Sequence, residues 1–379
     1  MMIKLIKFLS IFAALFFSLY VYAETNTPHT ELVNQTISSF MTNNEIPGVA
    51  VQLYVHGQPS SYYYGYADRD KKIPVTEKTI FELGSISKVM TSILLAQEVD
   101  FAKMSFNDPV KKYIKDLPDV FNEISLQNLA THTSGLPFNV PNNVATPTQL
   151  QNYLANWKPN VDPNERWQYS NVGIGMLGKA LESSTQWDFN KLYIRHILNP
   201  LRMQQIGTNV PPKLKKYIAQ GYDKNGDPTR PVQFGLFPSA GGLKVMAGDM
   251  QKFLSAAIGL PGTPPRVLWP IRMTQTTFVK YAGNQQGLAW SIHSLKNMSD
   301  LLDASNDVVL DSIAVDGIYE KPPYDGDALI DKTGTTDGFR AYIAVIPNKK
   351  SGIVILANKN VPNSAIVKTA RELLYKLNQ

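Results

Sequence analysis

The stretch Gly84-Ser85-Ile86-Ser87-Lys88 stands directly before an apolar run, Val89 to Ala96, that has the length and spacing of a helix. Residues three apart on a helix share a face, so the hydroxyl of Ser85 and the amine of Lys88 are expected to meet. A serine hydroxyl is a weak nucleophile without a nearby base, and a lysine becomes that base when burial or neighbouring positive charge lowers its pKa. The positive end of the helix favours an oxyanion formed there. The stretch therefore predicts a nucleophilic serine with its own base.

Two further motifs offer groups that such a serine needs. Tyr169-Ser170-Asn171 stands just before a predicted helix, with Asn171 as its expected N-cap. A tyrosine whose pKa is lowered by ammonium groups can move protons, and an asparagine can bond both an amide and a lysine amine. Lys332-Thr333-Gly334 falls on a predicted strand, where the lysine offers positive charge to a substrate carboxylate and the glycine permits close approach. The backbone N–H groups of Thr335 and Ser85 are candidates for an oxyanion hole.

The combination of motifs is more specific than any one of them. Each occurs once, in the order Ser-x-x-Lys, Tyr-x-Asn, Lys-Thr-Gly. Ser-x-x-Lys alone is expected about once by chance in a chain of this length, and Lys-Thr-Gly more rarely. A helix start with a solvated lysine would explain the first motif by itself, but it does not explain the three together.

The composition is that of a globular protein with a large core. The chain has 379 residues, of which 44% are hydrophobic and 18% are charged. Its formal charge is +6, which falls to +4 without Lys4 and Lys7, and no basic stripe or run of like charge occurs. Nucleic acid binding is therefore not expected.

The first 23 residues have the pattern of a secretory signal peptide. Lys4 and Lys7 precede the apolar stretch Phe8 to Tyr22, and Ala23 is a small residue suited to cleavage. We expect export to the periplasm with cleavage after Ala23, which leaves no stable membrane anchor. An uncleaved anchor is the alternative, although the apolar run is short for a full span. The chain has no cysteine, so no disulfide is expected.

Patterns along the chain place strands near both ends and helices between them. Strands are predicted over 49–55, 62–67, 328–333, 339–346 and 352–357, and helices over 31–41, 89–96, 126–132, 146–157, 171–181, 192–198, 247–260 and 364–377. The fold class is therefore mixed α/β (α+β): an antiparallel sheet built from both chain ends and flanked by helices, with an inserted, mostly helical region. This arrangement gives a discontinuous sheet region, 24–80 and 215–379, and a mainly helical region, 81–214.

The three motifs together resemble those of the serine β-lactamase and penicillin-binding protein superfamily. Tyr169-Ser170-Asn171 is similar to the second motif of class C β-lactamases and of their D-Ala-D-Ala carboxypeptidase and esterase relatives, whereas class A enzymes have Ser-Asp-Asn there. The segments 81–88 and 332–363 strengthen the similarity to class C. The resemblance implies a serine β-lactamase-like fold and a β-lactam substrate. The sequence suggests no cofactor and no metal, and a monomer is the default expectation.

The resemblance also implies roles for individual residues. Ser85 would attack the β-lactam carbonyl and form an acyl-enzyme, while Lys88 and Tyr169 share the proton transfers. Lys332 and Thr333 would face the substrate carboxylate and Tyr169. Asn171 would hold Lys88 and would also bind the substrate. The other implied substrate-binding residues are Gly334 and Thr335 on the strand, Asn139, Tyr222 in the acyl side-chain pocket, and Asn363 near the substrate carboxylate. Water activated around Tyr169 would release the acyl group.

Three positions depart from the class C pattern. Asn139 stands where glutamine is usual, Asp337 where a small residue is usual, and Ile366 where many members have a basic residue. These differences bear on the preferred β-lactam more than on the reaction.

Other interpretations stay open at this point. A D-Ala-D-Ala carboxypeptidase or esterase of the same fold would use the same residues, and a non-hydrolytic penicillin-binding protein would be acylated and stop. His132 suggests a Ser-His arrangement, but a structural histidine near the site is the simpler interpretation. The five histidines lie far apart in the sequence and no His-Glu-x-x-His occurs, so a zinc hydrolase is not expected.

Overall fold

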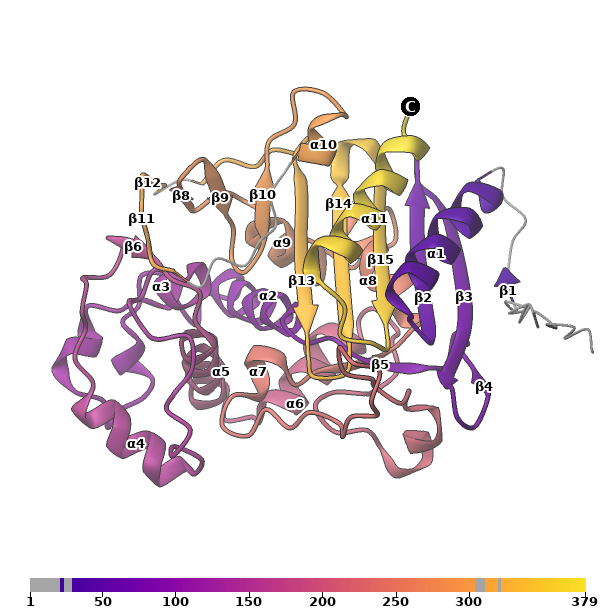
Figure 1. Cartoon of the computed structure of the whole chain (residues 1–379). Helices are drawn as coiled ribbons and strands as arrows, with labels where there is room; N and C mark the ends of the chain where they lie inside the picture. The colour runs from indigo at the N-terminus through magenta and orange to yellow at the C-terminus, as the bar shows by residue number, and fades with distance from the viewer. Residues whose placement is uncertain (1–20, 24–28, 304–310, 320–321) are drawn as a thin grey trace, which may run out of the picture.

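An antiparallel sheet of eleven strands runs through the molecule in the computed structural model, which describes residues 21–23, 29–303, 311–319 and 322–379 (Figure 1). Neighbouring strands follow the order β1-β3-β2-β15-β14-β13-β10-β9-β8-β12, and β4 pairs with β3. The strands are β1 Val21–Ala23, β2 Gly48–Val55, β3 Gln58–Asp68, β4 Ile73–Pro74, β8 Val279–Tyr281, β9 Asn284–Gln286, β10 Ser291–His293, β12 Gly317–Ile318, β13 Leu329–Thr335, β14 Arg340–Ile346 and β15 Ser351–Ala357. Two small sheets pair β5 Ile80–Glu82 with β7 Lys244–Met246, and β6 Arg166–Trp167 with β11 Ile313–Ala314.

The middle of the large sheet joins the two ends of the chain. β2 lies against β15 in a register that sets Val49 opposite Ala357 and Tyr54 opposite Gly352. Hairpins then extend the sheet on either side, from β2 to β3 and from β15 through β14 to β13. The prediction of one antiparallel sheet built from both chain ends is confirmed.

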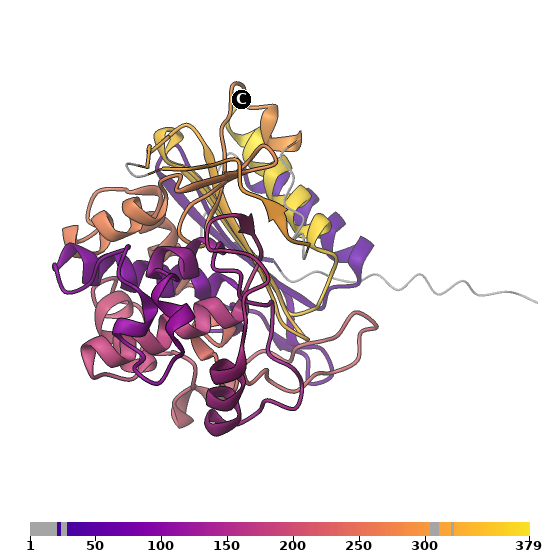
Figure 2. The same cartoon turned by 90° about the vertical axis from the view of Figure 1, so that its left-hand side faces the viewer.

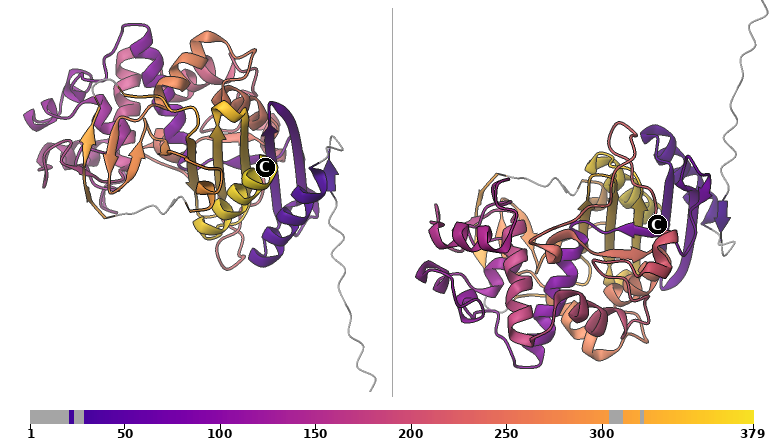
Figure 3. Two further views of the ribbon diagram at one scale, coloured as in Figure 1. Left: turned by 90° about the horizontal axis from the view of Figure 1, so that it is seen from above. Right: turned by 90° about the horizontal axis from the view of Figure 1, so that it is seen from below.

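Helices cover both faces of this sheet, as Figures 2 and 3 show. α1 Thr30–Asn44 and α11 Asn363–Leu377 pack on one face, and α8 Asp249–Ile258 packs on the other. Successive side chains of a strand point to opposite faces, so Val49 and Val51 lie in the core under α1 and α11 while Ala50 belongs to the opposite core. Burial on both faces explains why the central strands are almost continuously apolar.

The remaining helices lie mostly on the α8 side of the sheet. They are α2 Ile86–Asp100, α3 Leu126–Thr131, α4 Pro147–Asn156, α5 Asn171–Thr185, α6 Phe189–Tyr193, α7 Pro238–Gly241, α9 Pro265–Thr274 and α10 Asp300–Asp303, the last of which packs against α11. The helices predicted from the sequence are confirmed, with shifts of a few residues at their ends. The boundaries between a sheet region and a helical region stay a prediction.

The first turn of α5 differs from the prediction by one residue. Ser170, not Asn171, is the N-cap: its backbone is extended, and its Oγ accepts a hydrogen bond from the N–H of Gly173 at 2.8 Å. Asn171 is the first helical residue, and its side chain is engaged elsewhere, with Asn139. The prediction for Asn171 was therefore wrong because the shorter serine side chain already satisfies the helix end.

The predicted signal peptide falls mainly on residues 1–20, which lie outside the described residues. Val21–Ala23 forms β1 on the outer side of β3, and cleavage after Ala23 would remove this strand. Within the described ranges, no helix combines the length and the apolar character that crossing a membrane requires.

Candidate active site

The side chains of Ser85 and Lys88 meet at the start of α2. Ser85 is the N-cap of this helix, and Lys88 lies one turn further, fully buried. The Nζ of Lys88 donates to the Oγ of Ser85 at 2.9 Å and to the backbone carbonyl of Ala240, on α7, at 2.7 Å. The contact predicted from the helical spacing is confirmed. The contribution of Ala240 was missed, because a backbone carbonyl leaves no signal in the sequence.

Burial lowers the pKa of Lys88 and so makes its amine a better candidate for a base. It lowers the pKa of Lys88 to about 8, and the positive charge of Lys332 acts in the same direction against the opposing effect of Tyr169. About a tenth of the amine is therefore neutral at pH 7 and able to accept a proton, far more than for a lysine with an unshifted pKa.

Two glycines bring the turn before α2 into direct contact with β13. A Cβ at Gly84 would lie 2.5 Å from the backbone N of Thr335, and a Cβ at Gly334 would lie 2.0 Å from the carbonyl O of Leu83. Gly84 also has a positive φ of 51°, which a residue with a side chain rarely adopts. Only glycine fits at either position, and the fit sets the backbone of Thr335 beside that of the Ser85 turn.

Tyr169 lies beside this pair, and two ammonium groups approach its ring. The Nζ atoms of Lys88 and Lys332 are 5.0 and 4.9 Å from the ring centroid. Burial alone would raise the pKa of the Tyr169 hydroxyl. The charges of Lys332 and Lys88, together with hydrogen bonds to Ser85 and Lys88, outweigh this effect and lower the pKa to about 7. The phenolate is therefore accessible at neutral pH, which makes Tyr169 a second candidate for proton transfer.

His132 packs against Tyr169. Its buried ring lies 4.4 Å from the Tyr169 ring, and its Nδ1 accepts from the backbone N–H of Ser170 at 3.2 Å. Burial, followed by the charges of Lys88 and Lys332, holds the pKa of His132 well below its usual range. The imidazole is therefore neutral, and it fixes one face of Tyr169 without adding a third positive charge.

Lys332 and Thr333 lie in the middle of β13, and both are buried. The ion pairs of the described residues include neither Lys88 nor Lys332, so these two cations lie near Tyr169 without a carboxylate partner. Such an arrangement attracts an anionic ligand.

The opposite face of the same strand holds a compensated charge. Asp331 is fully buried, and its Oδ2 accepts from the Nη2 of Arg371 at 2.6 Å and from the Oη of Tyr342 at 2.5 Å. Burial raises the pKa of Asp331, but the charges of Arg371 and His293 outweigh it and hold the pKa well below its usual range. This ion pair ties β13 to α11.

Asn171 and Asn139 form a pair at the exposed side of the site. The Nδ2 of Asn171 donates to the Oδ1 of Asn139 at 2.8 Å, and its backbone N–H donates to the carbonyl of Phe138. The structure thus joins two of the predicted substrate-binding residues. Lys88 donates hydrogen bonds to Ser85 and Ala240, and none of the hydrogen bonds among the described residues joins it to Asn171.

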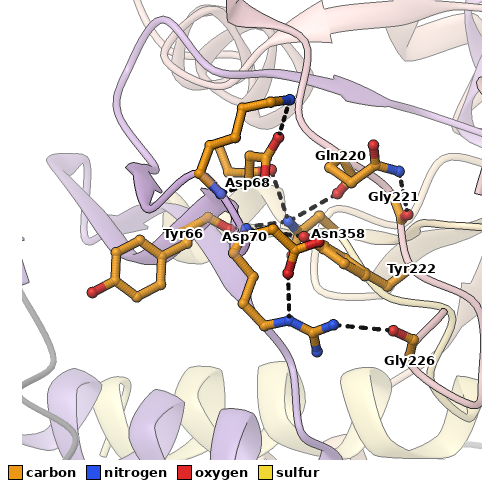
Figure 4. A network of polar contacts seen from close by, with 11 residues as sticks. Tyr66, Asp68, Asp70, Gln220, Gly221, Tyr222, Gly226 and Asn358 are labelled. Atoms are coloured by element: carbon orange, nitrogen blue, oxygen red, sulfur yellow. Dashed lines mark hydrogen bonds and ion pairs between the residues drawn. The ribbon is translucent and has the colours of Figure 1, made fainter. Parts of the chain in front are cut away.

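Tyr222 lies in a polar network beside β3 (Figure 4), and not beside Lys88 and Lys332. Its ring is fully buried, its Oη accepts from the backbone N–H of Arg69 at 2.9 Å, and its own N–H donates to the carbonyl of Asn358. The Asn358 amide donates to the carbonyls of Tyr66 and Gln220 at 3.0 and 3.1 Å. The network anchors the 220 segment to the sheet, and a role for Tyr222 in a substrate pocket stays a prediction.

A second polar set lies where β13 ends and α11 begins. Asn363 is the first residue of α11, and Arg340 opens β14 directly opposite Thr335. The guanidinium of Arg340 donates to the Oγ1 of Thr335 and to the Oδ1 of Asn360, the latter at 2.7 Å. Sequence analysis missed Arg340, although a cation directly after the Gly338 turn of a site strand was a usable signal.

The arrangement fits acyl transfer to serine. It combines a hydroxyl nucleophile, two proton acceptors with lowered pKa values, two adjacent backbone segments that offer N–H groups, and a cationic strand. Within the part of the chain that the structure describes, no three His, Cys, Asp or Glu side chains are grouped to hold a metal ion.

Comparison with known proteins gives consistent matches. A family model described as Beta-lactamase matches residues 33–376. The chain is 32% identical to a β-lactamase of Yersinia enterocolitica over 95% of each chain. It is similar to the structure of a class C β-lactamase in complex with cefoxitin, with a TM-score of 0.86 and 32% identity over 92% of this chain and 98% of that one. A β-lactamase/D-alanine carboxypeptidase from Pseudomonas syringae gives a TM-score of 0.87 and 32% identity over 92% and 99%.

Proposed function

The chain belongs to the β-lactamase family, and from this premise we propose that Ser85, Lys88, Tyr169 and Lys332 carry out its reaction. The protein is a hydrolase of the class C β-lactamase type that acts on the β-lactam amide. The observation that carries the assignment of residues is the 2.9 Å contact between Lys88 and Ser85, set beside a tyrosine that two ammonium groups acidify.

Acylation follows from this geometry. The Oγ of Ser85 attacks the β-lactam carbonyl carbon as its proton passes to the neutral Lys88 amine or to the Tyr169 phenolate. The N–H groups of Ser85 and Thr335 donate to the developing oxyanion. The C–N bond then breaks, the ring nitrogen takes the proton that left Ser85, from Tyr169 directly or from Lys88 by way of Tyr169, and an ester joins the opened substrate to Ser85.

Deacylation uses the same groups in the opposite sense. A water molecule attacks the ester carbonyl and gives its proton to Tyr169. The bond between the acyl carbon and the Oγ of Ser85 breaks, and Ser85 recovers a proton from the Lys88–Tyr169 pair. Because the positive charges of Lys88 and Lys332 hold Tyr169 acidic, its phenolate is available again for the next turnover.

The direct test is hydrolysis of a chromogenic cephalosporin by the purified mature protein, with intact mass measured during the reaction. We expect turnover with little accumulated adduct, and loss of both turnover and adduct in Ser85→Ala. Ser92→Ala is the matched control, because Ser92 is a buried serine of α2 whose Oγ has no hydrogen-bond partner among the described residues. Labelling of Ser85→Ala at the wild-type rate would refute the nucleophile assignment.

A D-Ala-D-Ala carboxypeptidase activity of the same site is the second candidate. One similar structure is that of a protein described as both a β-lactamase and a D-alanine carboxypeptidase. A stable adduct on Ser85 without turnover of the cephalosporin would favour this candidate or a non-hydrolytic penicillin-binding protein, and release of D-alanine from peptide substrates would separate the two.

Export to the periplasm with cleavage after Ala23, and action as a monomer, complete the proposal. The mass of the protein purified from a periplasmic extract tests the cleavage site, and light scattering tests the monomer.

A further inference from the structure

His132 joins the short helix α3 to the segment that carries Tyr169. It is the C-cap of α3, in the left-handed conformation with a φ of 63°, and its carbonyl accepts from the backbone N–H of Gln168 at 2.8 Å. Its Nδ1 accepts from the backbone N–H of Ser170 at 3.2 Å. These two hydrogen bonds hold the backbone immediately before and immediately after Tyr169, so His132 restrains the residue that carries the phenol.

The ring of His132 also packs against two aromatic side chains of that segment. Its centroid lies 4.4 Å from that of Tyr169, with 35° between the ring planes, and 6.0 Å from that of Trp167, with 85° between the planes. All three side chains are buried. One side chain thus supplies a hydrogen-bond acceptor for the backbone and a flat surface for the ring of Tyr169.

The hydrogen bond from Ser170 fixes the protonation state of the imidazole. A ring nitrogen that accepts carries no proton, so the proton of the neutral ring is on Nε2, which is buried and has no hydrogen-bond partner among the described residues. A second proton, on Nδ1, would remove the acceptor of Ser170. It would also set a positive charge near Lys88 on α2 and Lys332 on β13, beside the titratable ring of Tyr169. The imidazole therefore stays neutral while Tyr169 titrates.

Few residue types could meet these requirements at position 132. The left-handed backbone is open to glycine, asparagine, aspartate and histidine. Glycine has neither an acceptor nor a ring, asparagine has an acceptor but no ring, and aspartate would add a negative charge that opposes formation of a phenolate nearby. Neutral histidine alone among the four offers a ring and an uncharged acceptor.

We propose that His132 is a positioning residue of the reaction, which holds Tyr169 beside Lys88 and Lys332 and keeps further charge away from the phenol. This inference rests on the proton-transfer role proposed above for Tyr169. Because His132 acts through Tyr169, its substitution should alter the rate of reaction and its pH dependence in ways that follow the chemistry of the new side chain, and not only the stability of the variant.

Three substitutions separate the acceptor, the ring and the charge. His132→Asn keeps an uncharged acceptor, and we expect kcat/KM to fall by no more than about fivefold, with the acid limb of its pH profile near pH 7. His132→Phe keeps a ring but leaves the buried N–H of Ser170 unpaired, and kcat/KM should fall about 10²-fold. His132→Asp differs from His132→Asn only in its charge, and the acid limb should move up by about one pH unit.

His56 provides matched controls, because it also has a positive φ, of 50°, but is exposed in the turn between β2 and β3. The same three substitutions at His56 should leave kcat/KM and its acid limb unchanged. Thermal unfolding shows whether each variant is folded. If His132→Phe does not fold, the comparison of His132→Asp with His132→Asn decides alone.

Two results would overturn the inference while leaving the proposed function intact. One is an acid limb at the same pH in His132→Asp and His132→Asn, which would show that charge at this position does not reach Tyr169. The other is an equal fall of kcat/KM in His132→Asn and His132→Phe, which would show that the acceptor is not needed. Absence of Ser85 acylation in the wild-type protein would instead refute the proposed function itself.

Discussion

Asp331 and Lys332 are neighbours on β13, yet the structure treats their charges in opposite ways. Asp331 points toward α11, where Arg371 and Tyr342 compensate it at 2.6 and 2.5 Å. Lys332 points toward Tyr169 and Lys88, where the described residues provide a second cation and no carboxylate. One face of the strand thus carries a compensated ion pair, and the other carries two cations that repel each other.

The difference separates structure from function. A compensated buried charge has fixed protonation and contributes to stability, whereas crowded like charges shift the pKa values of the groups around them into the range where protons move. The two faces should therefore respond differently to substitution: the Asp331 face in the free energy of unfolding, and the Lys332 face in the rate of reaction.

Tyr169→Phe should give the largest effect and confine it to the reaction. Removing the phenol deletes a proton-transfer group, so kcat is expected to fall about 10³-fold, or about 4 kcal/mol. Steady-state hydrolysis and urea unfolding measure the two responses. Tyr193→Phe is the control, because Tyr193 is also fully buried and its hydroxyl has no hydrogen-bond partner within the described ranges. Unchanged turnover in Tyr169→Phe would remove that phenol from the proton path.

Asp331→Asn should show the reverse behaviour. It leaves Arg371 buried without its counter-ion, and we expect a loss of about 3 kcal/mol in the free energy of unfolding, at the lower end for a broken buried pair because the amide oxygen still accepts a hydrogen bond. Below the unfolding temperature, kcat should stay within a few-fold. Asp327→Asn, at an exposed position before the same strand, should change neither quantity. A large fall in kcat with full stability would break the comparison.

Gly334→Ala should lower both the free energy of unfolding and kcat. The new methyl group would lie 2.0 Å from the carbonyl O of Leu83, so the turn and the strand must move apart. We expect a loss of about 2 kcal/mol in stability, as for other overpacked sites, together with lower kcat because the Thr335 and Ser85 backbones separate. Gly317→Ala, where the added carbon meets nothing within 4 Å, is the control. Wild-type kcat in Gly334→Ala would show that the close contact is not required.

The pH dependence should show an effect of the Lys332 face alone. Tyr169, with a pKa of about 7, is protonated as the pH falls below 7, so kcat/KM should fall by up to tenfold per pH unit there. The folded-state pKa of Tyr169 lies below the unfolded value near 10, so its contribution to stability is present above pH 10 and is lost as the pH falls toward 7. The unfolding free energy of wild type relative to Tyr169→Phe should therefore rise from pH 7 to pH 10. An unchanged difference would mean that Tyr169 does not titrate in this range.

Local spacing predicted the parts of the site that one element provides. The contact between Ser85 and Lys88 follows from the helix repeat, and the strands at both chain ends follow from runs of apolar residues. The position of Lys332 on a strand was also confirmed, because that segment leads into two further apolar strands.

The features that the sequence did not reveal depend on contacts between distant segments. The carbonyl of Ala240 reaches Lys88 across 152 positions, and Arg371 pairs with Asp331 across 40. The strands between 279 and 293 have three residues each, too few for a periodic pattern, and α9 contains Pro270, which argues against a helix in the sequence alone. Such features are decided by packing rather than by local preference.

The close packing of Gly84 against Thr335, and of Gly334 against Leu83, also has a consequence for the synthesis of the chain. About 250 residues separate the two glycines, which a ribosome adds in roughly 10–50 s. During that interval the helix that carries the nucleophile has no strand to lie against, and the backbone N–H of Thr335 has not yet been made. Until Thr335 has been added, the nascent chain carries Ser85 without one of the two backbone N–H groups proposed to stabilise its oxyanion.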